Sequence, residues 1–250
     1  MPFVDNNGTK IHYETEGTGP PLILQHGTTG SWEDWAEFGY AQPLRGQYRL
    51  ILIDARGHGA SDKPHDPVAY DLALRAADVV AVLDDLGIPK ANFFGYSLGG
   101  WIGFGVAKHA PDRLSSLILG GAHPYDENMQ PFRDAMPRDA DAFMAAMEQV
   151  YGPNLTPALR ARLRLNDLEA LAAMTQDRPS VADVLPKMAM PCLLFVGEAD
   201  PRLARVRQCA AALGNATLFT LPGKDHVGGF AASDLVLPHV QAFLAKVSAI

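Results

Sequence analysis

Short apolar runs, separated by segments with helical spacing, recur along most of this chain of 250 residues. The runs are rich in β-branched, leucine or aromatic residues and fall at 21–25, 48–53, 91–96, 114–119, 191–196 and 216–221. A strand that is covered on both faces needs no polar alternation, so continuous runs of this length are typical of parallel sheets. Apolar residues spaced by three and four predict helices at 70–86, 101–109, 202–213 and 234–247. Together these patterns predict a doubly wound α/β fold with a mostly parallel sheet.

One segment near the start departs from the pattern of buried strands. Residues 10–15 alternate Ile11 and Tyr13 with polar neighbours. This alternation predicts a strand with one exposed face, and we expect it to lie at the edge of the sheet.

A second segment, residues 123–187, carries no strand signal. It contains three helix starts, at Asp139, at Thr156 followed by proline, and at Asn166. Methionines and phenylalanines concentrate in it, and we interpret them first as packing core and second as an apolar substrate wall: Met129, Phe132, Met136, Phe143, Met144, Met147 and Met174. We therefore expect an α/β core of residues 1–122 and 188–250, with a helical lid inserted at 123–187.

Composition limits the partners of the chain. With 21 basic and 28 acidic residues the net charge is −7, and no segment gathers the lysines and arginines that a nucleic-acid site needs. The apolar runs are too short to span a bilayer, and the first residues lack the basic and apolar regions of an export signal. We expect a cytoplasmic protein that acts on a small molecule. No pattern in the sequence specifies an oligomeric state.

The most specific motif is Gly95-Tyr96-Ser97-Leu98-Gly99, which follows one apolar run and precedes a helical pattern. A serine on a sharp turn between a strand and a helix has a cramped backbone, and glycine two residues before and after it avoids a collision. The hydroxyl is then exposed at a helix N-terminus, where free N–H groups favour a developing oxyanion. Gly-x-Ser-x-Gly also arises by chance in glycine-rich loops, so the motif needs a base and an acid to support it.

A serine hydroxyl becomes a nucleophile when a base accepts its proton and a third group orients that base. Asp200 follows the run at 191–196, and His226 follows the run at 216–221. We place both in loops at the carboxyl edge of the sheet, where Ser97 also emerges. Glu198 is a minor alternative to Asp200, and Asp225 a weaker one because it adjoins the histidine.

The order Ser97, Asp200, His226 is that of the α/β-hydrolase superfamily, which the chain resembles over almost its full length. Two more motifs carry the resemblance, Gln25-His26-Gly27-Thr28-Thr29-Gly30-Ser31 and Asp54-Ala55-Arg56-Gly57-His58-Gly59-Ala60-Ser61. It implies Ser97 as nucleophile, His226 as general base and then acid, and Asp200 as orienter. It also implies an oxyanion hole made by the N–H groups of Thr28 and Leu98.

Other residues near the predicted triad have expected supporting roles. His26 is expected to brace the oxyanion loop, and Arg56 and His58 to form hydrogen bonds with the backbone at a glycine turn. Residues expected to line the pocket are Thr29, Tyr96, His123, Phe143 and Met144; for His123 a purely structural role is an equal alternative. The histidines and carboxylates show no spacing typical of a metal site, and no glycine-rich nucleotide loop is present, so we expect no cofactor.

Serine in place of aspartate in the motif disfavours epoxide hydrolase and dehalogenase chemistry, because those reactions need a carboxylate nucleophile. The resemblance to bacterial enol-lactone hydrolases and to aryl and carboxyl esterases implies a serine hydrolase of small carboxylic esters or lactones. Two alternatives stay open at this point. The same triad serves carbon–carbon bond hydrolases, thioesterases and perhydrolases, and a small-molecule receptor can use this fold with vestigial catalysis.

Overall fold

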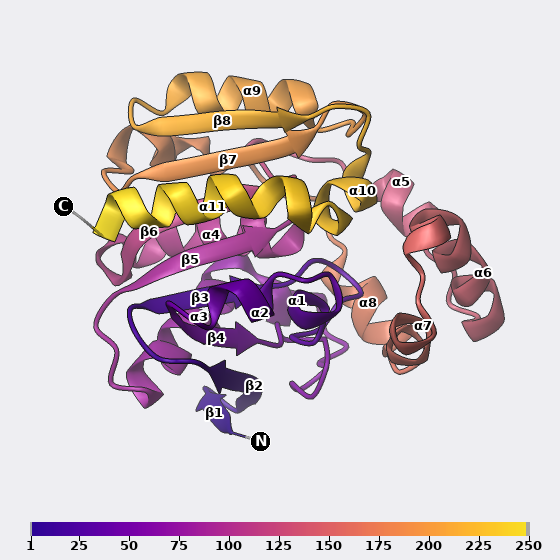
Figure 1. Ribbon diagram of the computed structural model, residues 1–250. Coiled ribbons are helices and arrows are strands. Elements are labelled where there is room, and N and C mark those ends of the chain that lie inside the picture. The colour runs from indigo at the N-terminus through magenta and orange to yellow at the C-terminus, as the bar shows by residue number, and fades with distance from the viewer. Residues whose placement is uncertain (1, 249–250) are drawn as a thin grey trace.

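An eight-stranded sheet forms the centre of the computed structural model, which describes residues 2–248 (Figure 1). In chain order the strands are β1 (Phe3–Asn6), β2 (Thr9–Glu16), β3 (Pro21–Gln25), β4 (Arg49–Ile53), β5 (Ala91–Tyr96), β6 (Leu114–Gly120), β7 (Cys192–Gly197) and β8 (Ala216–Leu221). Their order across the sheet is β1-β2-β4-β3-β5-β6-β7-β8. The β1–β2 and β2–β4 pairs are antiparallel, whereas all pairs from β4 to β8 are parallel.

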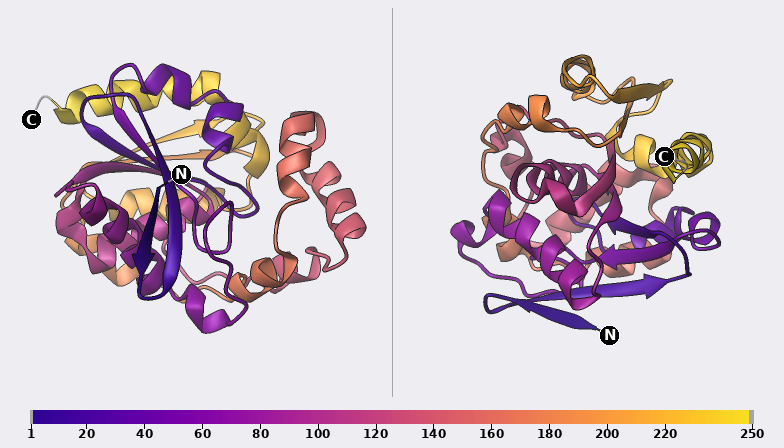
Figure 2. Two further views of the ribbon diagram at one scale, coloured as in Figure 1. Left: turned by 90° about the horizontal axis from the view of Figure 1, so that it is seen from below. Right: turned by 90° about the vertical axis from the view of Figure 1, so that its left-hand side faces the viewer.

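Helices cover both faces of the sheet, as Figure 2 shows in two further views. The α-helices are α1 (Asp34–Glu37), α2 (Ala41–Leu44), α3 (Leu72–Asp85), α4 (Leu98–His109), α5 (Gln130–Asp134), α6 (Ala140–Tyr151), α7 (Pro157–Leu163), α8 (Leu168–Met174), α9 (Leu203–Ala212), α10 (His226–Ala231) and α11 (Ser233–Ser248). Short 3₁₀ helices are η1 (Pro67–Tyr70), η2 (Pro111–Arg113), η3 (Gly152–Asn154) and η4 (Ala182–Lys187). Buried side chains of α3, α4 and α9 pack on one face, and those of α1, α2 and α11 on the other.

Alternate residues of the central strands supply these two cores. On β3, Ile23 belongs to the core under α3 and α4, whereas Leu22 and Leu24 belong to the core under α11. On β5, Phe93 and Phe94 divide in the same way, and all five of these side chains are fully buried. Burial of each such side chain stabilises the fold by about 1.5–3 kcal/mol. The continuous apolar runs of the sequence are thus strands covered on both faces, and the predicted α/β fold class is confirmed.

The prediction for the first strand region was wrong in two respects. Residues 10–15 do form β2, but β2 lies between β1 and β4 and is not an edge strand. Its polar residue His12 is fully buried rather than exposed, because its Nδ1 lies 2.8 Å from Oδ2 of the buried Asp54. The edge strand on this side of the sheet is β1, whose four residues carry no clear alternation.

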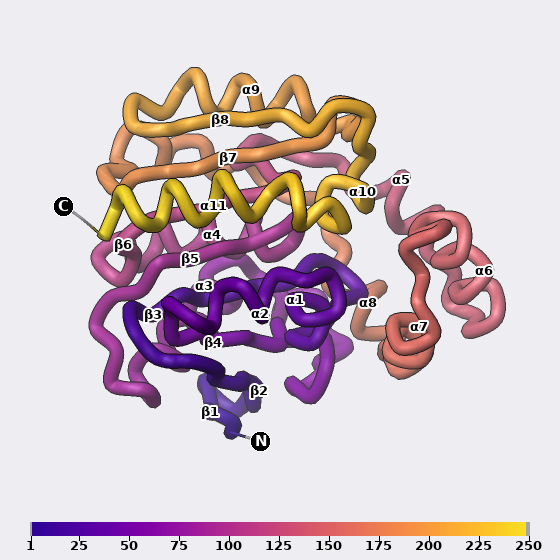
Figure 3. The backbone as a smooth tube through the Cα atoms, in the orientation of Figure 1, coloured from indigo at the N-terminus to yellow at the C-terminus, as the bar shows by residue number. Residues whose placement is uncertain are grey.

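Between β6 and β7 the chain forms α5 to α8, and these helices extend beyond the carboxyl ends of the parallel strands (Figure 3). Asp139 caps α6 and Thr156 caps α7, as predicted. The cap of α8 is Asp167, not Asn166, whose side chain donates instead to the carbonyl of Thr29. The division into a core and a lid at 123–187 stays a prediction. In residues 2–248, every helix is too short or too polar to cross a membrane.

Candidate active site

A serine stands at a strained turn between β5 and α4. Ser97 precedes Leu98, the first residue of α4, and has φ of 53° and ψ of −112°. This backbone conformation is sparsely populated for a residue with a side chain and costs about 1–3 kcal/mol, which the surrounding packing must offset. A Cβ on Gly95 would overlap the backbone of Gly99, and a Cβ on Gly99 would overlap the carbonyl of Gln25. The predicted need for both glycines therefore has a direct steric cause.

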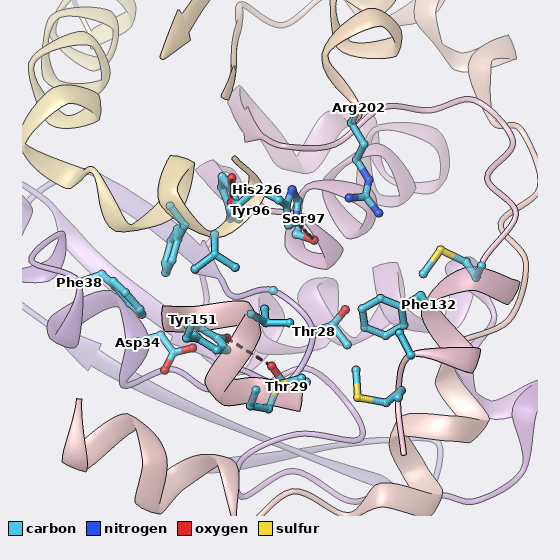
Figure 4. Close-up of a pocket in the computed structure, with 18 of the residues that line it drawn as sticks. Thr28, Thr29, Asp34, Phe38, Tyr96, Ser97, Phe132, Tyr151, Arg202 and His226 are labelled. Atoms are coloured by element: carbon cyan, nitrogen blue, oxygen red, sulfur yellow. Dashed lines mark hydrogen bonds between the residues drawn. The ribbon is translucent and has the colours of Figure 1, made fainter. Parts of the chain in front are cut away.

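Hydrogen bonds link this serine to His226, which follows β8, and link His226 to Asp200, which follows β7. Nε2 of His226 lies 2.9 Å from Oγ of Ser97, and Nδ1 of His226 lies 2.6 Å from Oδ2 of Asp200. Because the carboxylate can only accept, Nδ1 carries the imidazole hydrogen, and Nε2 accepts the hydrogen of the serine hydroxyl. The structure therefore brings together the three residues singled out from the sequence, with Ser97 and His226 side by side at the cavity in Figure 4.

Asp200 is held in a buried, ionised state. Asp200 is only 3% exposed, and its Oδ1 accepts a hydrogen bond from the backbone N–H of Arg202 at 2.9 Å. Burial opposes ionisation, but the hydrogen bond and charge interaction with His226, together with the Arg202 N–H, leave the pKa of Asp200 below its usual value. The carboxylate is thus negative at neutral pH and can stabilise a positive charge on the imidazole.

His226 begins a helix, whereas the sequence predicted a loop. It is the first residue of α10, and the preceding Asp225 caps that helix by accepting the N–H of Gly228 at 2.7 Å. Of the two alternatives to Asp200, Asp225 is therefore engaged with the helix backbone. Glu198 accepts a hydrogen bond from the Thr220 hydroxyl at 2.8 Å and also lies outside the array.

Tyr96 holds the backbone of the histidine. Its hydroxyl donates to the carbonyl of His226 at 2.6 Å, and the two rings lie 5.3 Å apart. Burial raises the pKa of Tyr96 well above its usual range, so the phenol stays protonated and remains a donor. The residue before the serine thus fixes the start of α10 relative to the turn.

The loop after β3 faces the serine from the other side. Within residues 2–248, the N–H groups of Thr28 and Leu98 have no backbone acceptor. The next residue, Thr29, has a positive φ of 68°, and its N–H donates to Nε2 of His58 at 3.3 Å. Burial keeps the pKa of His58 well below its usual range, so this imidazole is neutral and can accept. The loop is therefore held by a side chain of the segment that follows β4.

His26 braces the same loop, in agreement with its predicted structural role. Its Nε2 accepts the N–H of Ala55 at 3.1 Å, and its Nδ1 donates to the carbonyl of Gly27 at 2.7 Å. For Arg56 the prediction was incomplete, because it donates to the backbone of Ala69 but mainly to both carboxylate oxygens of Asp78, at 2.6 Å each. Both residues link the segment after β4 to its surroundings.

A cavity of about 240 Å³ opens next to Ser97 (Figure 4). Most of its wall is apolar and comes from α6, α10, the α5 region and the residue after α1: Phe38, Met129, Phe132, Ala135, Met136, Met147, Val150, Val227 and Phe230. Polar and charged groups on the wall are Thr28, Thr29, Asp34, Tyr96, Tyr151, Arg178, Arg202 and His226. A small apolar cavity with a few convergent polar groups is the usual form of a small-molecule site.

Of the five residues expected to line the pocket, the structure places two on the cavity wall and three away from it. Thr29 and Tyr96 line the cavity. Phe143 and Met144 do not, because they are buried in the hydrophobic core one turn of α6 before Met147, where the cavity begins. His123 is also buried away from the cavity, and its Nδ1 has no hydrogen-bond partner within residues 2–248.

Other wall residues were missed or undervalued by sequence reasoning. Met129, Phe132, Met136 and Met147 belong to the methionine-rich segment, where a substrate wall was only the second interpretation. Arg202 lies two residues after Asp200, and this short spacing to a strand-end carboxylate was the one available signal for it. Among the described residues, no group of three or more His, Cys, Asp or Glu side chains is placed to hold a metal ion.

Known proteins resemble the chain over most of its length. Residues 20–226 match the model of the alpha/beta hydrolase fold family. The enol-lactonase from Burkholderia xenovorans LB400 is 25% identical, with a TM-score of 0.85 that covers 98% of this chain and 100% of that protein. A Bacillus subtilis (strain 168) protein with the provisional name 2-succinyl-6-hydroxy-2,4-cyclohexadiene-1-carboxylate synthase is 26% identical over 226 residues, 79% of this chain and 81% of the relative.

A third relative matches over a shorter stretch. Epoxide hydrolase 3 from Siraitia grosvenorii is 34% identical over 116 residues, which is 46% of this chain. The match spans 36% of the length of that enzyme. The similarities therefore reach proteins with different reactions, so membership of the fold family alone does not specify the reaction.

Proposed function

The chain belongs to the alpha/beta hydrolase fold family, and on this premise we propose that it is a serine hydrolase of small carboxylic esters or lactones. The observation that carries the proposal is the hydrogen-bonded array of Ser97, His226 and Asp200 at the wall of a small apolar cavity. The enol-lactonase from Burkholderia, similar over nearly the whole chain, favours lactones among the substrates. The family and this neighbour support hydrolase activity, and the residue roles that follow are part of the proposal.

In the proposed reaction, Oγ of Ser97 attacks the acyl carbon while Nε2 of His226 takes up the hydroxyl proton. The carbonyl oxygen becomes an oxyanion and accepts hydrogen bonds from the N–H groups of Thr28 and Leu98. When the carbon–oxygen bond breaks, the imidazolium returns the proton to the departing alkoxide, leaving an acyl-enzyme. Water, activated by His226, then attacks the acyl-enzyme in the same way, which releases the acid and restores the serine. In a lactone, both product groups stay on one molecule.

We further propose that residues 123–187 form a lid over this site. The helices of that segment lie beyond the carboxyl ends of the strands and supply apolar wall residues such as Phe132 and Met147. Arg162 of α7 pairs with the buried Asp34 of α1 at 3.0 Å and lies 3.5 Å from Glu37. These contacts tie the lid helices to the core beside the cavity, so the apolar wall has a defined position.

The pH profile gives one test of the assigned roles. Measured from pH 5 to 8, activity should rise along a single acid limb and then level off, because a protonated imidazole cannot accept the serine proton. The pKa of Asp200 is lowered, so its carboxylate loses its charge only below its usual range near ~3.9 and adds no second limb in this interval. Measuring kcat/KM at constant ionic strength tests this, and a flat profile would contradict the role of His226.

A substrate panel tests the reaction class. The purified protein is assayed with p-nitrophenyl acetate, butyrate and palmitate and with a small lactone, and with a thioester, a β-diketone and hydrogen peroxide plus a carboxylic acid. The cavity of about 240 Å³ predicts that acetate, butyrate and lactone are preferred over palmitate. A large preference for the thioester, the diketone or the peroxide would replace ester or lactone hydrolysis by the corresponding reaction of the same triad. Tight ligand binding without turnover would instead indicate a receptor.

A further inference from the structure

Two arginines share one glutamate at the wall of the cavity. Nη2 of Arg202 lies 2.6 Å from Oε1 of Glu127, and Nη1 of Arg178 lies 3.0 Å from Oε2 of the same carboxylate. Arg178 and Arg202 both line the cavity, whereas Glu127 is not part of its wall. The carboxylate therefore holds the two guanidinium groups from outside the cavity wall.

This cluster is fixed by further contacts. Glu127 and Arg178 also pair through their backbones, with N···O distances of 3.0 Å in both directions. The guanidinium of Arg178 lies over the Trp101 ring, 5.6 Å from its centroid. The backbone of Arg202 is held by Asp200. Both cationic side chains are thus tied to elements that do not depend on a bound ligand.

The negative groups near the two arginines already have partners. Glu127 is shared between the arginines. Asp200 lies close enough for the charge of Arg202 to lower its pKa, but its oxygens accept hydrogen bonds from His226 and from the Arg202 N–H. Asp34, the acidic residue on the cavity wall, is paired with Arg162. None of these carboxylates therefore occupies all the donors of either guanidinium.

Each guanidinium also has free donors. A guanidinium carries five N–H groups. In the part of the chain that the structure describes, Nη1 of Arg178 donates a hydrogen bond to Glu127 and Nη2 of Arg202 forms an ion pair with it, and no other side-chain partner engages either guanidinium through a hydrogen bond. Figure 4 shows the guanidinium of Arg202 reaching into the cavity on the side of Ser97 that faces Phe132. The remaining donors are suited to a planar anion, which an arginine binds through two parallel hydrogen bonds.

We propose that the substrate carries a carboxylate besides its scissile ester or lactone group, and that Arg202 and Arg178 bind this carboxylate next to Ser97. The proposal rests on the proposed ester or lactone hydrolysis and names its substrate class: monoesters of dicarboxylic acids, or lactones with a free acid group. Binding would occupy the guanidinium donors that the contacts with Glu127 leave free. The apolar part of the wall would hold the hydrocarbon chain between the two functional groups.

A matched pair of esters tests the proposal. Monomethyl glutarate and methyl valerate have the same chain, and differ in that a carboxylate replaces the terminal methyl group. Hydrolysis by the purified protein is followed by pH-stat titration. We expect kcat/KM to be about 10- to 100-fold higher for monomethyl glutarate, mainly through KM, because charge-assisted hydrogen bonds of this kind exceed neutral ones.

Three variants assign the effect to the cluster. Arg202→Gln leaves Glu127 paired with Arg178 and should bring the ratio of the two kcat/KM values close to one. Arg202→Lys keeps the charge without the planar fork and should keep part of the preference. Arg205→Gln removes the same charge from an exposed residue of α9 outside the cavity, and should keep the wild-type ratio. Equal kcat/KM for both esters in the wild type, or an unchanged ratio in Arg202→Gln, would overturn the carboxylate proposal while leaving ester hydrolysis intact.

A binding measurement separates the two proposals if neither ester is hydrolysed. Absence of hydrolysis would count against the proposed ester hydrolysis for these two esters. Calorimetry with monomethyl glutarate and Ser97→Ala protein then decides the carboxylate proposal: binding that is lost on adding Arg202→Gln supports it, and absence of binding overturns it.

Discussion

Replacing Ser97 with alanine is expected to lower kcat/KM for ester or lactone hydrolysis by at least about 10⁴-fold. The change removes Oγ, the atom 2.9 Å from Nε2 of His226, so no acyl-enzyme can form. The N–H donors of Thr28 and Leu98 and the apolar wall are left in place. The residual rate should therefore be that of direct attack by water on a bound substrate. Initial rates with p-nitrophenyl butyrate and covalent labelling by a fluorophosphonate measure both consequences.

The control is Ser115→Ala, which removes a hydroxyl from β6 outside the cavity. Ser115→Ala should keep the wild-type rate and the fluorophosphonate label, whereas Ser97→Ala should lose both with its thermal unfolding midpoint retained. Turnover in Ser97→Ala at the wild-type rate would rule out the serine as nucleophile.

The largest expected effect on stability comes from Asp78→Asn. Asp78 accepts hydrogen bonds from Nε and Nη2 of Arg56 at 2.6 Å and from Asn6 at 2.7 Å, and both charged side chains are about 5% exposed or less. Removing the negative charge leaves the guanidinium of Arg56 buried without a counter-ion. The free energy of unfolding should fall by about 3–5 kcal/mol, measured by urea denaturation.

A surface pair on the same helix provides the control for this effect. Asp84 of α3 lies 2.7 Å from Nη1 of Arg113, but its side chain is 64% exposed. Asp84→Asn makes the same chemical change and should cost no more than about 1 kcal/mol, because water screens the pair. Equal losses in Asp78→Asn and Asp84→Asn would show that burial does not decide the contribution of the pair.

Much of the fold was predictable because its information is local. Each run such as 21–25 or 91–96 carries the continuous apolar character of a strand covered on both faces, and the structure places strands there. The residues of the array were also predictable, since Ser97, Asp200 and His226 each follow such a run and parallel strands end at one edge. β1 escaped prediction because four residues are too few to show a period.

The cavity wall was harder to predict because it depends on how helices dock. Phe143 and Met147 lie on the same helix four residues apart, yet the first is enclosed in the core and the second faces the cavity. The pairing of Glu127 with Arg178 and Arg202 joins three distant positions of the chain. Helical periodicity indicates which face is apolar, but not where along the helix the core ends.

The strained backbone of Ser97 has a consequence for evolution. Among residues 2–248, three non-glycine residues have a positive φ, and two of them, Thr29 and Ser97, lie at this site. Glycine would adopt the conformation of Ser97 without strain. Selection for heat resistance alone would therefore favour loss of the serine, and its retention in a lineage would be a sign that turnover, rather than durability, is what selection maintains.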